Sequence, residues 1–288
     1  IKNKIEIQSS KKAHLYDGIA MCKFLFWYKN HSGELSELDV VEKVNKLRSQ
    51  NKSFICASFP TIAGSAENGA IIHYQPNKLS SRKIKKSDIL LLDSGGQYYY
   101  GTTDVTRTIS RGKKVSKEII FNYTIVLKSH INVNLSKFPI GTPCSFLDLV
   151  ARKILWEVGE DFAHSTGHGV GFCLNVHEGP FAISSKNISP LNENMLFSNE
   201  PGIYKNGKYG IRIENLVSTR KIILNKKTFL ALENHTFVPY DRELIDVSLL
   251  SLKEKNWLNN YHKNVIKKIG SKLNYKERVW LESQCKRI

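Results

Sequence analysis

Apolar residues recur at helical spacing in two parts of the chain. Up to about residue 50 the pattern is helical, and Ser36 and Asp39 form a capping-box-like start before a run of valines. Between Ser116 and Gly159 the spacing predicts two further helices, the second opening at Ser145 with an aspartate three residues on. Gly159 is a typical stop for such a helix.

Strand patterns lie between and after these helical regions. Strand signals predict strands at 69–74, 88–93, 98–109, 195–204 and 209–217. Several of these strands follow one another as hairpin-like pairs. The mixture predicts an α+β fold with a largely antiparallel sheet flanked by helices.

From Ser251 the pattern changes to a polar helix, with Ser251 and Glu254 as its cap. Its apolar stripe consists of Trp257, Leu258, Tyr261, Val265 and Ile269. The stripe is narrow, so we expect this helix to pack on the core of its own domain rather than on a membrane. The chain is thus divided into a main domain, 1–245, and a C-terminal helical extension, 246–288.

Composition is that of an ordinary globular protein. The 288 residues are 41% hydrophobic and 24% charged, enough for a sizeable core. The richest apolar stretch, 19–28, is interrupted by Lys23 and is too short to span a membrane, and the opening residues hold no apolar signal core. Because the first residue is not Met, we expect an excised domain or a processed chain.

The net charge of +17 is the one unusual bulk property. The excess is lysine, 33 Lys against 10 Arg, spread along the chain without a nucleic-acid-binding module. Solvated lysine faces explain this better than a nucleic-acid partner. The five cysteines show no paired metal spacing, which favours a reduced, cytoplasmic compartment.

Two aspartates, Asp93 and Asp104, are joined by a glycine-rich reversal through Gly95, Gly96 and Gly101. In an extended segment Asp104 shares the polar face of neighbouring threonines, opposite the apolar side chains. If the chain turns back, the two carboxylates approach each other closely. Such a pair needs a positive partner, and a metal ion would serve.

Two other clusters carry candidate ligands. His164, His168 and His177 fall within a glycine-rich stretch, where glycines let side chains crowd a small ligand. Glu200 lies in SNEPGIY, and Glu214 lies in GIRIEN, where alternation puts it on one face with an arginine.

Two Asp, two Glu and one or more His make a dinuclear ligand set, of the kind aminopeptidases use to activate a bridging water. An oxygen-rich set favours Mn²⁺, with Co²⁺, Fe²⁺ and Zn²⁺ also open.

The strings LLLDSGGQYYYGTTDVTRT, HSTGHGVG, NVHEGP, SNEPGIY and GIRIEN together resemble the signature blocks of the Xaa-Pro aminopeptidases (aminopeptidase P), which are pita-bread metallopeptidases. The order D, D, H, E, E, with separations of 11, 64, 32 and 14 residues, adds to the match. The segment WLNNYH at 257–262 resembles the C-terminal extension of the larger, cytosolic type. The resemblance implies a pita-bread fold with a curved sheet, and that the amino-terminal domains of that type are absent from this chain.

The resemblance also assigns roles to residues. It implies that the metal ligands are Asp93, Asp104, His168, Glu200 and Glu214, with Asp104 and Glu214 bridging two divalent ions. It implies that the catalytic side chains are Glu200, His177, His164 and His73, and that the substrate is bound by His73, His168, His177 and Arg212. The sequence departs from the family pattern at Ser165, where glycine is usual, and at Ile203, where an aromatic residue is common.

The predicted activity is hydrolysis of the first peptide bond of peptides with proline at the second position, through a hydroxide bridging the two ions. Glu200 would pass its proton to the leaving nitrogen, His177 and His73 would donate to the carbonyl oxygen, and Arg212 would orient a ligand carboxylate. For Arg212 a surface salt bridge is the alternative.

Prolidase and methionine aminopeptidase share the five-ligand plan, and a non-enzymatic pita-bread module that binds peptides or proteins is a further alternative. The family implies a homodimer, with no nucleic-acid or membrane partner.

Overall fold

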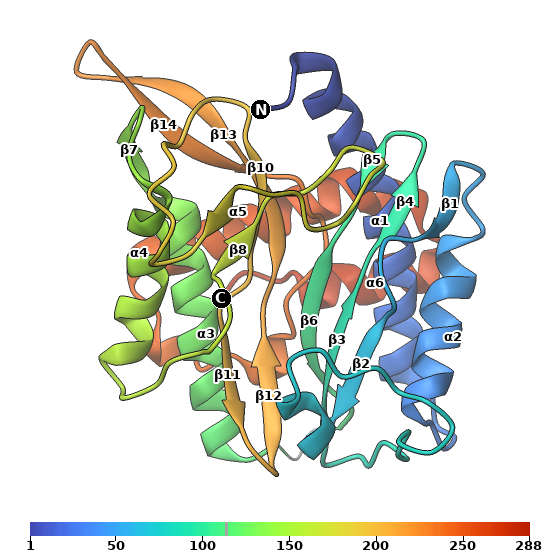
Figure 1. Cartoon of the computed structure of the whole chain (residues 1–288). Helices are drawn as coiled ribbons and strands as arrows, with labels where there is room; N and C mark the ends of the chain where they lie inside the picture. Colours follow the sequence, from blue (N-terminus) through green and yellow to red (C-terminus); the bar gives the residue numbers. More distant parts are fainter. Residues whose placement is uncertain (113–114) are drawn as a thin grey trace.

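Two pairs of helices flank antiparallel sheets, and two further helices lie outside them (Figure 1). The structure is a computed structural model that describes residues 1–112 and 115–288. Its α-helices are α1 (Lys4–Asn30), α2 (Glu37–Arg48), α3 (Lys117–Leu135), α4 (Cys144–Trp156), α5 (Leu252–Ile269) and α6 (Tyr275–Gln284). Short 3-10 helices are η1 (Ala66–Ala70), η2 (Arg242–Leu244), η3 (Val247–Leu249) and η4 (Gly270–Lys272). Within the described ranges, no helix is both long and apolar enough to cross a bilayer.

Helix starts follow the capping signals of the sequence with one exception. Ser36 and Asp39 form the expected capping box of α2, and Ser251 with Glu254 forms that of α5. The expected start at Ser145 is wrong, because α4 begins at Cys144 and Pro143 occupies the N-cap position. The aspartate of that motif, Asp148, is instead buried and accepts hydrogen bonds from the side chains of Arg152 and Thr166.

All strand pairs within the named sheets of the described residues are antiparallel. The strands are β1 (Phe54–Ala57), β2 (Ile62–Ser65), β3 (Ile89–Ser94), β4 (Gly96–Tyr98), β5 (Gly101–Thr102), β6 (Val105–Ser110), β7 (Lys137–Pro139), β8 (Gly167–His168), β9 (Ala182–Ile183), β10 (Leu196–Asn199), β11 (Gly202–Lys205), β12 (Tyr209–Arg212), β13 (Asn215–Leu224) and β14 (Lys227–Asn234). The larger sheets have the orders β2-β3-β6 and β10-β13-β14-β7. The α+β class with a largely antiparallel sheet is confirmed.

Three of the expected strands are interrupted rather than continuous. The strand expected at 98–109 is broken before Val105, the one at 195–204 after Asn199, and the one at 209–217 after Arg212. Asp104 therefore lies between two strands and not in the middle of one. The strand expected at 88–93 is present as β3.

The strand expected at 69–74 is wrong, because η1 ends at Ala70 and the following residues form no strand. The backbone of η1 packs directly on β12. A Cβ atom added to Gly210 would lie 1.8 Å from the carbonyl oxygen of Gly69, so only glycine allows this approach. The 3-10 turn brings the segment that follows it, with His73, to the sheet.

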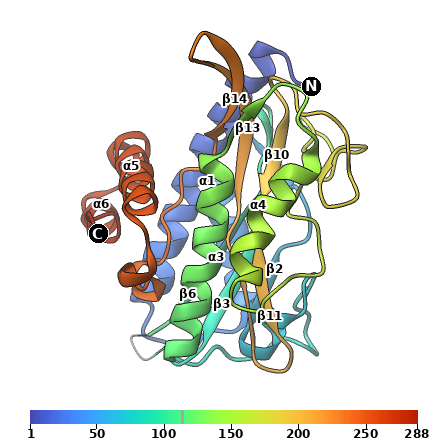
Figure 2. The same ribbon diagram turned by 90° about the vertical axis from the view of Figure 1, so that its left-hand side faces the viewer.

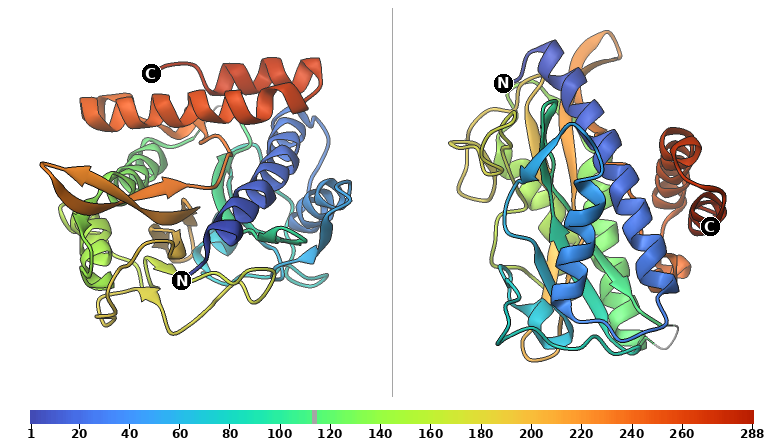
Figure 3. Two further views of the ribbon diagram at one scale, coloured as in Figure 1. Left: turned by 90° about the horizontal axis from the view of Figure 1, so that it is seen from above. Right: turned by 90° about the vertical axis from the view of Figure 1, so that its right-hand side faces the viewer.

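Each helix pair covers one sheet and buries a separate apolar cluster. Side chains of α1, α2, β3 and β6 form one cluster, and those of α3, α4, β10 and β14 form another. A third cluster joins α3 and β12 to α5 and α6, which lie on the outer side of α1 and α3 (Figures 2 and 3). The expected stripe of α5 is buried at Leu258, Tyr261, Val265 and Ile269.

His262 on α5 makes the packing of the extension sensitive to acid. The ring is 2% exposed, its Nε2 accepts a hydrogen bond from the Tyr240 amide, and burial lowers its pKa to about 3. The unfolded chain takes up this proton below about pH 6.5, whereas the folded protein does not. The contribution of His262 to the unfolding free energy is therefore fully present above about pH 6.5 and is lost progressively as the pH drops toward 3.

We expect His262→Gln to reduce the slope of unfolding free energy against pH by up to about 1.4 kcal/mol per pH unit, measured by urea unfolding from pH 7 to 4. An unchanged slope would contradict this.

Candidate metal centre

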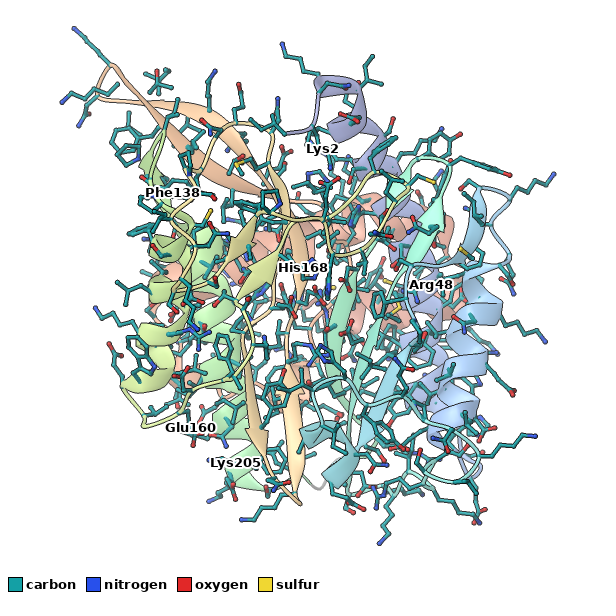
Figure 4. All side chains as sticks on the ribbon, in the orientation of Figure 1. Lys2, Arg48, Phe138, Glu160, His168 and Lys205 are labelled. Atoms are coloured by element: carbon teal, nitrogen blue, oxygen red, sulfur yellow. The ribbon has the colours of Figure 1, made fainter. Side chains whose placement is uncertain are left out.

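A cavity of about 520 Å³ opens among the sheets, lined by all the candidate ligands except Glu214. His168, at the end of β8, lies near the centre of the molecule (Figure 4). The polar side chains that line the cavity are His73, Gln75, Asp93, Asp104, His164, Ser165, His168, His177, Glu178, Glu200 and Arg212. Glu214, 1% exposed, lies deeper. The structure thus brings residues from all three clusters of the sequence to one place.

Each of three carboxylate residues lies where the chain leaves one strand for the next. Asp104 precedes β6, Glu200 follows β10, and Glu214 precedes β13. The amide of Glu200 donates to the carbonyl oxygen of Thr166, and the amide of Glu214 donates to that of Thr106. These bonds to distant segments hold each glutamate backbone out of its own hairpin.

The two aspartates are brought together by the reversal that the glycines predict. Asp93 in β3 lies opposite Thr106 in β6, so β3 and β6 pair directly. At Gly95 a Cβ atom would lie 1.9 Å from the carbonyl oxygen of Thr103, which excludes any larger residue there. The close packing of this turn fixes Asp104 beside Asp93.

The carboxylates are packed as a cation site would require. In the described part of the chain, Asp93 Oδ1, Asp104 Oδ1 and Glu214 Oε1 are buried without a hydrogen-bond partner. Ligand atoms of Asp104, His168 and Glu214 lie within 4.8 Å of one another, and His168 Nε2 is 3.3 Å from Glu200 Oε1. Buried charged oxygens without partners are costly. Carboxylate oxygens with one imidazole nitrogen suit divalent cations, so these residues fit a metal site.

The pKa values of the buried carboxyl groups also favour a cation site. Burial, and then the charges of Asp93 and Glu200, raise the pKa of Asp104 well above its usual value. Burial, and then the charges of Asp104, Glu200 and Asp93, raise the pKa of Glu214 likewise. Burial also raises the pKa of Glu200, although His168 and Arg212 oppose it. Several carboxylates thus compete for too little positive charge, and cations would relieve the repulsion.

Arg212 begins a chain of hydrogen bonds that leads from the carboxylates to His164. Its Nη2 donates to Asp93 Oδ2 at 2.6 Å, and its Nη1 donates to the Tyr204 hydroxyl at 2.7 Å. The Tyr204 hydroxyl lies 2.8 Å from His164 Nε2, and His164 Nδ1 lies 2.8 Å from the Ser165 carbonyl. His164 therefore carries its proton on Nδ1 and accepts from Tyr204. Arg212 is 1% exposed, so it forms no surface salt bridge.

The other histidines that line the cavity are His168, His177 and His73. The rings of His168 and His177 are 4.0 Å apart between centroids, nearly edge to face. Burial, and then the neighbouring His168 and His73, lower the pKa of His177. A neutral His177 beside the carboxylates can donate one hydrogen bond into the cavity.

Sequence reasoning missed two residues of the site. Tyr204 links Arg212 to His164, but its position in SNEPGIY assigns it no role. Arg107 is fully buried, and its Nη1 donates to the Glu214 carbonyl at 2.6 Å. Its Nη2 donates to Asn215 Oδ1 at 2.8 Å and to the Tyr261 hydroxyl at 3.1 Å. Arg107 thereby joins helix α5 to the backbone that carries Glu214.

An α+β fold that gathers three carboxylates and an imidazole in one cavity, with a fourth carboxylate buried beneath them, defines a metalloprotein with a carboxylate-rich centre. Comparison with known families narrows this broad class of metalloproteins to one family. Residues 8–221 match metallopeptidase family M24, and residues 228–288 match the C-terminal region of peptidase M24. The chain belongs to metallopeptidase family M24.

Relatives of known name support the expected resemblance. The chain is 43% identical to Xaa-Pro aminopeptidase 1 of Dictyostelium discoideum over 99% of this chain and 48% of that protein. The structure of X-prolyl aminopeptidase from Caenorhabditis elegans, described as a cytosolic enzyme with a di-nuclear active site, aligns with TM-score 0.95 and 40% identity over 100% of this chain and 48% of that one. A prolidase from Thermococcus sibiricus aligns with TM-score 0.69 and 33% identity over 85% of this chain and 62% of that one.

These similarities confirm the resemblance to the Xaa-Pro aminopeptidases and the pita-bread fold with its C-terminal helices. The chain spans about half the length of the aminopeptidases that it matches.

Proposed function

We propose that this chain forms the catalytic part of a metal-dependent Xaa-Pro aminopeptidase, which releases the first residue of peptides with proline at the second position. The observation that carries the proposal is the set of three buried carboxylate oxygens, on Asp93, Asp104 and Glu214, that have no hydrogen-bond partner among residues 1–112 and 115–288. Two of these residues, Asp104 and Glu214, have ligand atoms within 4.8 Å of His168. Similarity to Xaa-Pro aminopeptidases over nearly the whole chain supports the choice of substrate.

We propose that the ligands are Asp93, Asp104, His168, Glu200 and Glu214, that Asp104 and Glu214 bridge two divalent ions, and that Mn²⁺ is the native metal. When bound, such ions would acidify water and polarise the scissile carbonyl. The di-nuclear active site described for the C. elegans enzyme supports the count of two.

The remaining roles belong to the chain's own side chains. Glu200, with one oxygen within reach of Ser198 and His168, is placed to accept a proton and deliver it to the leaving proline nitrogen. His177 and His73 are placed on the cavity wall to donate to the carbonyl oxygen of the substrate. Both ring nitrogens of His164 are engaged, so it acts through the Tyr204 hydroxyl that it orients. Arg212 fixes Asp93 from behind.

Several broader properties belong to the same proposal. We propose a cytoplasmic location, in line with the description of the C. elegans enzyme, and a homodimer without nucleic-acid or membrane partners. The division of the chain into 1–245 and 246–288 stays a prediction, as does the existence of amino-terminal domains in the whole protein.

The test is a panel of three substrates with the Mn²⁺-loaded chain: a tripeptide with proline at position two, an Xaa-Pro dipeptide, and a peptide that begins with Met-Ala. We expect release of the first residue of the tripeptide, and loss of this activity in EDTA. Cleavage of the dipeptide alone would favour a prolidase, and release of Met would favour a methionine aminopeptidase. If no substrate were cleaved at saturating metal, the result would favour a non-enzymatic module that binds peptides or proteins.

A further inference from the structure

A second groove, of about 1030 Å³, runs between α1, β14 and α5 and contains none of the candidate catalytic residues. One of its walls is α5, the helix on the outer side of the molecule (Figure 3). Its lining combines apolar side chains such as Trp257 and Leu232 with amides and basic residues. This composition differs from that of the metal centre and is not explained by peptide cleavage.

Asparagines form a regular row along the α5 wall. Asn256, Asn260 and Asn264 line the groove, and within the described ranges their exposed side-chain amides form no hydrogen bond with the protein. Residues four apart on a helix lie on one face, about 6 Å apart along the axis. The two-residue repeat of an extended peptide is about 6.6 Å. Consecutive asparagines can therefore meet every second residue of an extended chain.

The side-chain amides of the three asparagines favour a bound chain whose backbone has both donors and acceptors. Each asparagine offers both a donor N–H and an acceptor oxygen, and a peptide backbone offers both in return. A phosphodiester backbone offers acceptors only, so it would leave the amide oxygens unused. The row of amides thus favours a polypeptide over a nucleic acid.

The charge of the groove selects an acidic occupant. Lys253 and Lys268 lie near the two ends of α5, and Arg220 lies on β13; all three line the groove, and in the described part of the chain none of them forms an ion pair. The one acidic side chain in the lining, Glu233, is paired with Lys11 at 2.9 Å. Uncompensated positive charge attracts acidic partners.

We propose that this groove binds an extended acidic peptide segment of a partner protein, with backbone held by the three asparagines and acidic side chains by Lys253, Lys268 and Arg220. Alternate side chains of an extended segment point to opposite sides, so apolar ones can rest on Trp257 and Leu232. The site goes beyond the proposed peptidase activity and does not depend on it.

The test uses an N-acetylated, proline-free, fluorescent peptide of about ten residues in which glutamate alternates with leucine, titrated into the whole chain at low salt. We expect saturable binding that weakens at least about tenfold in Asn256→Ala/Asn260→Ala/Asn264→Ala. Alanine is a better helix former than asparagine, and these positions are exposed, so the triple variant should stay folded. Lys253→Glu/Lys268→Glu should weaken binding to a similar extent.

A matched control lies on the same helix. Lys263 and Lys267 are exposed on α5 but do not line the groove. Lys263→Glu/Lys267→Glu makes the same change of net charge and should leave binding within about twofold. Equal loss in both double variants, or no loss in the triple alanine variant, would overturn the proposal.

Two further results would also overturn it. Binding of an oligothymidylate of equal charge as tightly as the peptide would indicate a general polyanion surface. A change from dimer to monomer in the groove variants, measured by sedimentation, would make the occupant a second copy of this chain.

Discussion

Replacement of Glu200 by glutamine is expected to lower kcat for release of a residue before proline by about 10³-fold or more, with the fold intact. The two side chains have nearly the same shape, so the packing after β10 is kept. Glutamine, however, cannot accept and return a proton, and its neutral carbonyl oxygen is a weaker metal ligand than a carboxylate. General acid–base catalysis alone contributes about 10² to 10⁴-fold, and weaker metal binding adds to this.

The matched control is Glu193→Gln, which makes the same chemical change at a surface glutamate that is ion-paired with Lys221. We expect it to leave kcat within about twofold, since surface ion pairs contribute little. Both variants should be assayed at saturating Mn²⁺, so that weaker metal binding is not mistaken for lost proton transfer. More than a tenth of normal kcat in Glu200→Gln would assign the proton transfer to another group.

Alternation along strands predicted the faces of the site correctly. Arg212 and Glu214 share a face as expected, and both reach the hydroxyl of Thr106. On the other face, Ile211 and Ile213 enter the apolar core. This part could be predicted because the two-residue period is a local property of extended backbone.

The strand breaks at the candidate ligands could not be predicted in this way. Glu200 leaves its hairpin because its amide bonds to Thr166, and Glu214 because its amide bonds to Thr106. Both partners are distant in sequence, so no window along the chain contains them. A local hairpin pattern therefore predicts continuous strands through the candidate ligands Glu200 and Glu214.

The need of Arg107 for buried partners could have been predicted from its position in the sequence. In β6 it shares the face of Val105 and Ile109, which enter an apolar cluster, so an arginine there needs buried partners. The partners include the carbonyl of Glu214, the side chain of Asn215, the carbonyl of Val238 and the hydroxyl of Tyr261, on three separate segments. The sequence can show that Arg107 needs buried partners, but it cannot identify those partners.

Replacement of Glu214 by glutamine is expected to change stability in opposite directions with and without metal. In the metal-free protein, Glu214 is 1% exposed, one of its oxygens has no partner among the described residues, and three other carboxylates act on it. Removing its charge should raise the metal-free unfolding free energy by about 1–2 kcal/mol. With metal present, the lost ligand should remove much of the stabilisation by binding, which is about 2.7 kcal/mol at a metal concentration of 100 times Kd. Urea unfolding in EDTA and in excess Mn²⁺ measures both.

Glu37 supplies the control for neutralising a buried glutamate. It is fully buried as well, but its oxygens accept hydrogen bonds from the Ser65 amide, the Tyr74 hydroxyl and the Arg82 amide. Glu37→Gln removes an accepting oxygen from satisfied donors, so it should destabilise the protein by about 1–3 kcal/mol, equally with and without metal. If Glu214→Gln destabilised the metal-free protein to the same extent, the Glu214 carboxylate would be a structural acceptor rather than one kept in place for a cation. Opposite signs in the two media would instead tie its burial to the metal.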